Sequence, residues 1–302
     1  MPFTLRTLSR RQFLAATAAG AATLLTPPGR SEDRACDPSR FALLSDTHLA
    51  GDPNTVARDI NMRDHLQAVV REVLAVQPAL AGVFISGDCA YNQGLSEDYK
   101  TLLDTLQPLR ESGLPVHLAL GNHDHRERFR EAFGEAVRKA SLLEAKHVLI
   151  VPAPHANWFV LDSLDETNKT PGKLAAEQLQ WLARALDQAA DKPALVLVHH
   201  QPDNRPVVSG LVDTDPLFEI LAPRRQVKSL FFGHTHVWNV SERDGIHLVN
   251  LPPTAYVFSP TQPNGWVDAR VAADGATLEL RCLNPQHARH GQRVELKWRT
   301  NT

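Results

Sequence analysis

The sequence contains few cysteines, little net charge and no long apolar segment. Only three cysteines, Cys36, Cys89 and Cys282, occur among its 302 residues. This count excludes a dense disulfide framework and a thiolate metal site, and leaves open one disulfide with a free thiol. The formal net charge of -2 gives no reason to expect nucleic acid or an anionic membrane as a partner. An apolar content of 43% and a charged content of 22% are ordinary for a globular protein with a sizeable core.

The N-terminal segment has the composition of an export signal. Ser9-Arg10-Arg11-Gln12-Phe13-Leu14 resembles a twin-arginine signal, and a weakly apolar, alanine-rich run extends from Phe13 to Leu25. A short amphipathic helix is the alternative, but no acidic residue precedes Glu32 and Pro27-Pro28-Gly29 ends the run. The run is too short for a transmembrane helix, so no stable membrane anchor is expected.

We therefore expect residues 1–35 to be a twin-arginine signal and linker, and residues 36–302 to form one domain. The twin-arginine translocation machinery would then be a partner of the precursor. The mature protein would be exported, to the periplasm or another extracytoplasmic compartment.

The first half of the predicted domain alternates buried strands with helices. Segments 41–44, 80–85 and 116–120 are apolar runs typical of buried strands. Apolar residues at helical spacing follow the first two, and the second helix is predicted to begin at an N-cap, Ser96, and to end at Gly113. This rhythm predicts parallel strands joined by right-handed crossovers, so that the strand tips share one edge of a sheet.

The second half is predicted to be more antiparallel. Strands are expected over 148–151 and 158–161, a helix over 175–189 and a strand over 194–198. Asp215-Pro216 resembles an N-cap followed by proline at the first helical position. A closing meander of strands is expected near Val237, Ile246, Val267, Leu278 and Val294.

Histidine is abundant, and histidines gather with carboxylates where strands end. The sequence has fourteen histidines, and imidazole is the commonest metal ligand. Five predicted strand ends carry ligand types, namely Asp46 and His48, Asp88, Asn122 and His123, His199 and His200, and His234 and His236. Singly, each motif has a structural explanation, such as an Asx-turn or a buried histidine. Their joint occurrence favours a metal centre.

The kinds of ligand indicate the metal and the chemistry. Carboxylate and amide oxygens mixed with imidazoles suit Zn, Mn or Fe rather than Ca or Cu(I). The ligands outnumber the needs of one ion. Two ions about 3.5–4 Å apart that share a carboxylate are the arrangement used for in-line displacement at phosphorus. A hydroxide shared by such ions is a nucleophile at neutral pH, and the ions neutralise phosphoryl charge.

The order D-x-H, G-D, G-N-H-D, histidine after a strand and G-H-x-H resembles the calcineurin-like metallophosphoesterase superfamily. The resemblance extends from about Phe41 to His236. Segments 161–163, 178–182 and 199–202 are most similar to the class III cyclic-nucleotide phosphodiesterase branch. The resemblance implies the metallo-dependent phosphatase fold, an α/β protein built as a four-layer α/β/β/α sandwich of two mixed sheets flanked by helices.

The resemblance also implies the metal ligands. One ion would be held by Asp46, His48 and His236, the other by Asn122, His199 and His234, and both by Asp88. A slip of one residue would exchange His199 with His200. Tyr91, three residues after Asp88, stands where purple acid phosphatases place a tyrosinate ligand to ferric iron. Because those enzymes lack the histidine found here at His48, packing or support of a ligand is the favoured role for Tyr91.

Further residues are implied around the metals. His123 would be the catalytic histidine that binds no metal, protonating the leaving alkoxide or stabilising phosphoryl charge. Asp124 would orient the site, and His200 would lie near the substrate. His125 and Arg126 would contact the substrate phosphate, or would simply begin a solvated helix.

The expected function is hydrolysis of a small phosphate ester by two transition-metal ions, Fe, Mn or Zn. A phosphodiesterase of the cyclic-nucleotide or glycerophosphodiester type is favoured. A phosphomonoesterase of the same fold is one alternative. A non-catalytic, metal-stabilised binding protein is another, but such a protein is expected to have lost a ligand or His123, and neither is missing here.

Overall fold

The computed structural model describes residues 35–205 and 207–300, so the predicted twin-arginine motif lies outside the described residues. Strands of the first sheet are β1 (Cys36–Leu44), β4 (Ala79–Ile85), β5 (Val116–Leu118), β12 (Gly265–Val271), β13 (Gly275–Cys282) and β14 (Arg293–Lys297). Those of the second sheet are β6 (Leu149–Pro152), β7 (Asn157–Val160), β8 (Ala194–Leu197), β9 (Val227–Phe232), β10 (Asn239–Arg243) and β11 (Ile246–Asn250). The strands β2 (Val56–Ala57) and β3 (Ile60–Asn61) form a separate hairpin.

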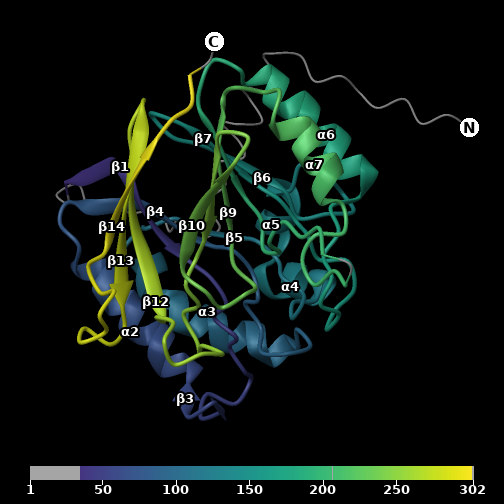
Figure 1. Ribbon diagram of the computed structural model, residues 1–302. Helices are drawn as coiled ribbons and strands as arrows, with labels where there is room; N and C mark the ends of the chain where they lie inside the picture. The colour runs from purple at the N-terminus through teal and green to yellow at the C-terminus, as the bar shows by residue number, and fades with distance from the viewer. Residues whose placement is uncertain (1–34, 206, 301–302) are drawn as a thin grey trace, which may run out of the picture.

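Two six-stranded sheets pack face to face, and helices cover their outer sides (Figure 1). The strand orders are β14-β13-β12-β1-β4-β5 and β10-β11-β9-β8-β7-β6. The helices are α2 (Met62–Ala75), α3 (Ser96–Glu111), α4 (Arg126–Phe133), α5 (Glu135–Ala140), α6 (Ala175–Gln188) and α7 (Thr214–Leu221). Figure 1 shows α6 and α7 together, on the opposite side of the molecule from α2 and α3. The predicted four-layer α/β/β/α sandwich is confirmed.

Alternating side chains of β1 explain this layering. Phe41 and Leu43 belong to the apolar layer between the sheets, whereas Ala42 and Leu44 belong to the layer under α2 and α3. Such alternation follows from the two-residue period of a strand. Trp158 fills the layer between the sheets, with its ring centroid 5.7 Å from that of Phe41.

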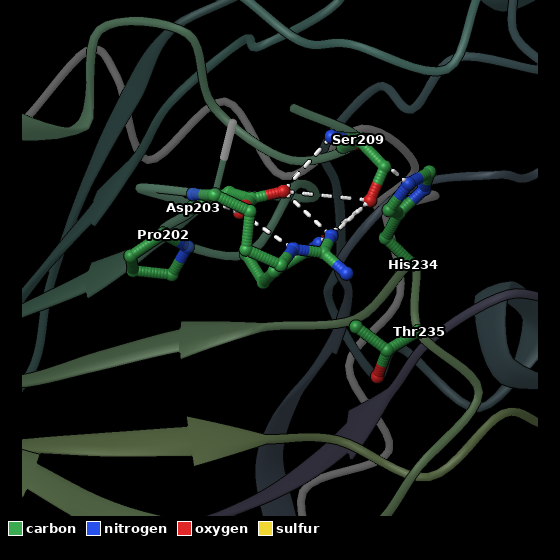
Figure 2. Close-up of a pocket in the computed structure, with 7 residues that line it drawn as sticks. Pro202, Asp203, Ser209, His234 and Thr235 are labelled. Atoms are coloured by element: carbon green, nitrogen blue, oxygen red, sulfur yellow. Dashed lines mark hydrogen bonds and ion pairs between the residues drawn. The ribbon is translucent and has the colours of Figure 1, made fainter. Parts of the chain in front are cut away.

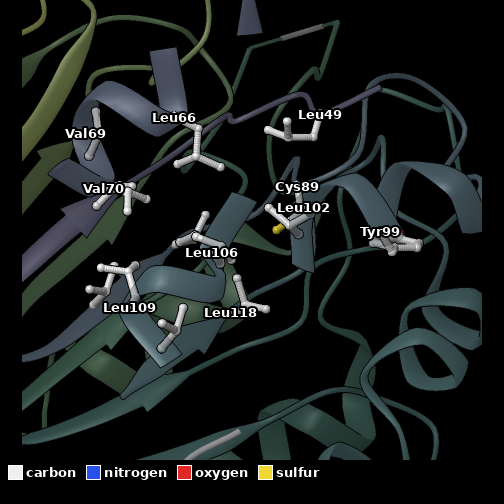
Figure 3. Packing of buried hydrophobic residues seen from close by; sticks show 14 of the residues in the cluster. Leu49, Leu66, Val69, Val70, Cys89, Tyr99, Leu102, Leu106, Leu109 and Leu118 are labelled. Carbon is white, nitrogen blue, oxygen red and sulfur yellow. The ribbon is translucent and has the colours of Figure 1, made fainter. Parts of the chain in front are cut away.

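The outer layers follow the helical period. In α2 the buried residues are Leu66, Val69, Val70 and Val73. Their spacing of three and one residues places them on one face of the helix. Figure 3 shows several of them gathered with leucines of α3 and with Leu118 of β5. Burial of each such side chain contributes about 1.5–3 kcal/mol, so these layers hold the sandwich together.

The parallel strands of both sheets end at a common edge. β1, β4 and β5 are parallel, as are β7, β8, β9 and β11. The loop after β11 joins the two sets, because the Thr254 amide donates to Ser45 O at 2.8 Å and the Ala255 amide to Asp46 O at 3.0 Å. The predicted common edge of strand tips is therefore present.

Two predicted helix starts are corrected. Leu95, rather than Ser96, is the N-cap of α3, and the Asp98 carboxylate accepts from its amide at 3.0 Å. Asp213 is the N-cap of α7, while Asp215 lies inside the helix and pairs with Arg243.

The predicted closing meander is divided between the sheets, because β10 and β11 extend the second and β12 to β14 the first. The cysteine count left one disulfide open, and all three thiols are free. In the described part of the chain, every helix is too short or too polar to cross a membrane.

Candidate metal centre

The polar tips of five strands meet at the common edge. They follow β1, β4, β5, β8 and β9, and most of their side chains are buried. The buried ones are Asp46, His48, Asp88, Asn122, His199, His200 and His236. Asp46, Asp88 and His199 offer ligand atoms within 4.8 Å of one another although they follow three different strands.

Two glycines let the tips approach so closely. A Cβ on Gly233 would collide with Ser45 Oγ and stand 2.5 Å from Asp46 Oδ2. A Cβ on Gly121 would collide with Asp88 Oδ1 and stand 2.7 Å from His199 Cδ2. A side chain at either position would force the tips apart. Glycine is therefore needed at both positions because it has no Cβ.

The backbone is strained at many of the tips. Five tip residues that are not glycine adopt the left-handed region, with φ of 52° at Asp46, 47° at His48, 47° at Asp88, 67° at His234 and 56° at His236. Such conformations cost about 1–3 kcal/mol each and cluster at functional sites. The fold therefore holds these side chains in place at a cost to stability.

The first cluster consists of Asp46, His48 and His236. The Nε2 atoms of the two histidines are 3.1 Å apart, and His236 Nε2 lies 3.3 Å from Asp46 Oδ1. His48 Nδ1 faces Tyr91 O at 3.2 Å and His236 Nδ1 faces Tyr256 O at 2.6 Å. Because a carbonyl only accepts, each Nδ1 carries the proton and each Nε2 a lone pair. Two lone pairs directed at each other are typical of ligands that share a cation.

The second cluster consists of His199, His200 and His234, with Asn122 nearby. The ligand atoms of the three histidines lie within 4.8 Å of one another. His234 Nε2 faces Ser209 O at 2.9 Å, which leaves Nδ1 of His234 as its ligand atom.

Asp88 lies between the two clusters. Its Oδ2 is 3.2 Å from His199 Nε2 and 3.8 Å from His48 Nε2. Its Oδ1 accepts from the His123 amide at 2.8 Å.

Unpartnered buried atoms test whether metals fit these residues. Asp46 Oδ1, Asn122 Oδ1 and both ring nitrogens of His199 are buried without a hydrogen-bond partner. His199 Nε2 is near Asp88 Oδ2, but not in the geometry of a hydrogen bond. Each such atom costs about 1–3 kcal/mol unless something binds it. Imidazole, carboxylate and amide donors suit transition-metal ions, and the residues present fit two of them.

Neighbouring charges keep the two carboxylates of the site ionised, which is the form that binds cations. Burial alone would raise the pKa of Asp46 and Asp88, but neighbouring histidines, His236 and His199 foremost, outweigh it and hold both below their ordinary range. Burial opposes protonation of His199, yet the charge of Asp88 raises its pKa to about 9. Without metal, a proton on His199 thus supplies positive charge that the carboxylates attract.

Two of the proposed histidine ligands are already neutral at pH 7, whereas His199 would release its proton on binding metal. Burial is the main cause that lowers the pKa of His48 and of His234 to about 4. Because metal binding requires neutral imidazole and ionised carboxylate, these protonation states suit metal binding at neutral pH.

Sequence comparison supports what the geometry indicates. The sequence model of the calcineurin-like phosphoesterase family matches residues 39–238, more than half of the chain. The chain belongs to the calcineurin-like phosphoesterase family. As a member, it is a metal-dependent phosphoric ester hydrolase with a centre suited to two metal ions.

The chain is similar to two curated relatives and to one solved structure. The 3′,5′-cyclic adenosine monophosphate phosphodiesterase CpdA of Pseudomonas aeruginosa is 30% identical over 223 residues, covering 72% of this chain and 76% of the relative. CpdA of Escherichia coli K12 is 29% identical over 265 residues, covering 85% of this chain and 90% of the relative. A dimetal phosphatase from Danio rerio has the same fold, with a TM-score of 0.68 at 16% identity, covering 87% of this chain and 100% of that one.

His123 lies beside the clusters of this calcineurin-like centre and reaches solvent. Its side chain is 24% exposed, and its Nε2 is 4.0 Å from Asp88 Oδ2. Its Nδ1 faces Asn92 O at 2.9 Å, so Nδ1 bears a proton and Nε2 faces the site. The ring can therefore exchange a proton with a molecule bound there.

Asp124 joins two strand tips rather than lining the site. Its buried carboxylate accepts from the amides of Gly121 at 2.9 Å and of Cys89 and Ala90 at 3.1 Å. The Tyr99 hydroxyl donates to it at 3.2 Å. Burial raises the pKa of Asp124 to about 6, with the charge of Asp88 adding to the shift. Asp124 thus positions the tips after β4 and β5.

The predicted substrate contacts are placed differently from one another. His200 lies in the second cluster, with its Nδ1 2.7 Å from Ser163 Oγ. His125 is the N-cap of α4 and accepts from the Arg128 amide at 3.4 Å. Arg126 donates to Asp162 Oδ2 at 2.7 Å and to Leu164 O at 2.6 Å. His125 and Arg126 begin α4, as the helix-start alternative expects, but Arg126 is largely buried by its ion pair rather than solvated. We assign neither residue to the substrate.

Loops supply further residues that support the site. Two of them, Tyr256 and Phe258, belong to no sequence motif. Tyr91 and Tyr256 support His48 and His236 through their carbonyls, which agrees with the supporting role favoured for Tyr91. Tyr256 and Phe258 also stack on these two rings. The latter two lie beyond the last motif, in a loop without a recognisable pattern, so no signal in one sequence could have found them.

A pocket of about 380 Å³ adjoins the second cluster. It is lined by Gln201, Pro202, Asp203, Arg205, Ser209, His234 and Thr235. Figure 2 shows Ser209 beside His234 and linked to Asp203. The Asp203 carboxylate accepts from Arg205 Nε at 2.8 Å and from the Ser209 amide at 2.8 Å. The carboxylate therefore fixes the loop whose carbonyl orients His234.

Proposed function

We propose that this protein is an exported phosphodiesterase that hydrolyses 3′,5′-cyclic nucleotides. The observation that carries the proposal is the position of Asp88, a buried carboxylate between two clusters of imidazoles. The names of the relatives CpdA support the substrate class.

Seven side chains would hold the two ions. Asp46, His48 and His236 would hold one, Asn122, His199 and His234 the other, and Asp88 would contact both. Fe, Mn and Zn suit this donor set. When bound, the ions supply a nucleophile from water at neutral pH and neutralise charge on phosphorus-bound oxygens.

The chain's own residues supply the remaining steps. When the His123 ring carries a proton on both nitrogens, Nε2 gives its proton to the leaving alkoxide, while Nδ1 keeps the one that it donates to the Asn92 carbonyl. Asp124 holds the tip that carries His123 against the tip that carries Asp88. Tyr91 and Tyr256 keep His48 and His236 in the tautomer that presents Nε2.

A substrate screen with metal analysis tests this proposal. Adenosine 3′,5′-cyclic monophosphate, a glycerophosphodiester, bis(p-nitrophenyl) phosphate and p-nitrophenyl phosphate are compared on protein of measured metal content. We expect two ions per chain and faster cleavage of the cyclic nucleotide than of the other natural ester and of the monoester. Faster cleavage of p-nitrophenyl phosphate would establish the phosphomonoesterase alternative. Full metal content without any hydrolysis would indicate a binding protein.

Export by the twin-arginine pathway is the second part of the proposal. Arg10-Arg11 before Phe13-Leu14 supports it, and a folded metalloprotein can take this route with its metals in place. Replacing both arginines with lysine should retain the precursor inside the cell. Normal export of that variant, measured by fractionation, would refute this part and leave the enzymatic part intact.

A further inference from the structure

Two aromatic rings stack on the histidines of the first cluster. The Tyr256 ring stacks on His48 with centroids 5.1 Å apart and an interplanar angle of 22°. The Phe258 ring stacks on His236 at 4.3 Å and 23°. Both residues belong to the loop that follows β11. Phe258 is nevertheless 56% exposed, so it presents apolar surface to solvent directly beside two proposed metal ligands.

Arg58 reaches the same rings from a distant part of the chain. It lies in the turn between β2 and β3, and its Cζ is 4.8 Å from the Phe258 centroid and 5.8 Å from the Tyr256 centroid. Across residues 35–205 and 207–300, its guanidinium makes no hydrogen bond and no ion pair. Arg126 and Arg205, by contrast, are paired with carboxylates. Arg58 thus keeps its planar set of donors available.

The turn that presents Arg58 is unfavourable for its residues. Arg58 and Asp59 have φ of 51° and 63°, values that suit asparagine or glycine in a two-residue hairpin turn. An exposed phenylalanine and an unpaired arginine add no core packing. Strain together with exposed, unpaired groups at a site mouth is typical of ligand recognition.

We propose that Arg58, Phe258 and Tyr256 form a base-binding platform for the nucleobase of the substrate. This inference rests on the proposed function and names the part of the substrate that the metals do not hold. One aromatic ring separates the guanidinium from each imidazole of the first cluster. The platform therefore borders the first cluster, and we place the nucleobase on it while the phosphate lies at the metals.

The chemistry of these three residues suits a purine. A guanidinium stacks on planar rings and donates to ring nitrogens and carbonyl oxygens in its own plane. Imidazoles cover one side of the Tyr256 and Phe258 rings and Arg58 lies over the other, so the base stacks on the guanidinium that these rings hold. A cyclic sugar phosphate without a base has nothing to place on this surface.

Kinetics with matched substrates test the platform. Arg58→Gln and Phe258→Leu are compared with wild type on adenosine 3′,5′-cyclic monophosphate and on 1-O-methylribose 3′,5′-cyclic phosphate, which lacks the base. Each variant should raise KM for the nucleotide about tenfold and leave kcat and metal content unchanged. Neither should alter KM for the baseless ester. The control is Arg243→Gln, which removes an arginine 3.9 Å from the Phe218 ring, between residues that line neither cluster, and should change neither substrate.

Two results would overturn the platform. An equal rise in KM on both esters would mean that these residues contact the phosphate or the metal ligands. No rise on either would mean that they only pack.

A binding measurement separates this inference from the proposed function. If no cyclic ester is cleaved, equilibrium dialysis of adenosine 5′-monophosphate against ribose 5-phosphate still decides the matter. Preferential binding of the nucleotide by wild type, lost in Phe258→Leu and Arg58→Gln but kept in Arg243→Gln, would support the platform while the proposed reaction failed. Equal binding of both ligands by wild type would refute it.

Discussion

Asp88 is the residue on which both halves of the site depend. Its two oxygens contact His199, His48 and the His123 amide, and it is buried among them. His48, in contrast, shares ligand-atom groups with the first cluster and Asp88 but with no histidine of the second cluster. Loss of the shared carboxylate should therefore affect two ions, and loss of the imidazole only one.

We predict that Asp88→Ala retains fewer metal ions per chain than His48→Ala. The carboxylate would be a ligand to both ions, so its removal weakens both sites at once, while His48→Ala should keep the ion of the second cluster. Elemental analysis of protein purified in the same buffer measures the difference. Equal metal content in the two variants would contradict the shared ligand.

His123 is predicted to act as a proton donor. His123→Ala should keep both ions and lose about 10²–10⁴-fold in rate on an alkyl phosphodiester, because a poor leaving group needs a proton. The loss should be much smaller on bis(p-nitrophenyl) phosphate, whose phenolate leaves without one. His125→Ala is the control, since it removes a neighbouring imidazole that caps α4. Equal losses on both esters would assign His123 to phosphoryl charge, and loss of metal would make it a ligand.

The strand tips themselves depend on the space that glycine leaves. We predict that Gly233→Ala destabilises the protein by about 1–3 kcal/mol through overpacking and weakens metal binding, because the new methyl group displaces Ser45 and Asp46. Gly82→Ala is the matched control, since its Cβ would approach Pro115 O no closer than 3.4 Å. Denaturant midpoints and metal content measure both effects. Similar behaviour of the two variants would show that close approach of the tips does not require glycine.

The elements that the sequence predicted well are those with a repeated pattern. The strand β4 was predicted from its continuous apolar run, and the helix α2 from apolar residues that recur at helical spacing. The tips could be placed together because parallel strands end at one edge. Helix starts were less predictable, because Leu95 at the start of α3 has no capping side chain and Asp98 compensates from within the helix. Contacts such as Arg58 with Phe258 join loops far apart in sequence, and no local pattern indicates them.

On the scale of the whole molecule, three apolar layers determine stability, and two of them hold titratable groups. His117 on β5 is buried in the layer between the sheets, with its ring centroid 4.9 Å from that of Phe84. His147 is buried two residues before β6, and its Nε2 is 3.0 Å from Leu118 O. Burial is the main cause that lowers the pKa of each to about 4. Neither residue is one of the proposed metal ligands, so the titration of both affects the stability of the fold rather than metal binding.

These two histidines predict acid sensitivity. An unfolded histidine has a pKa of about 6.5, so between pH 6.5 and pH 4 the unfolded chain binds more protons than the folded one. Stability is therefore fully present above pH 6.5 and falls as the pH drops towards 4. For His117 the loss at pH 5 is about 2 kcal/mol. His117→Leu should thus lose less stability than wild type between pH 7 and pH 5, measured as urea midpoints on metal-depleted protein so that ligand protonation affects both proteins equally. His155→Leu, which replaces an exposed histidine, should retain the wild-type dependence. A His117→Leu profile parallel to wild type would show that folding does not lower the pKa of His117.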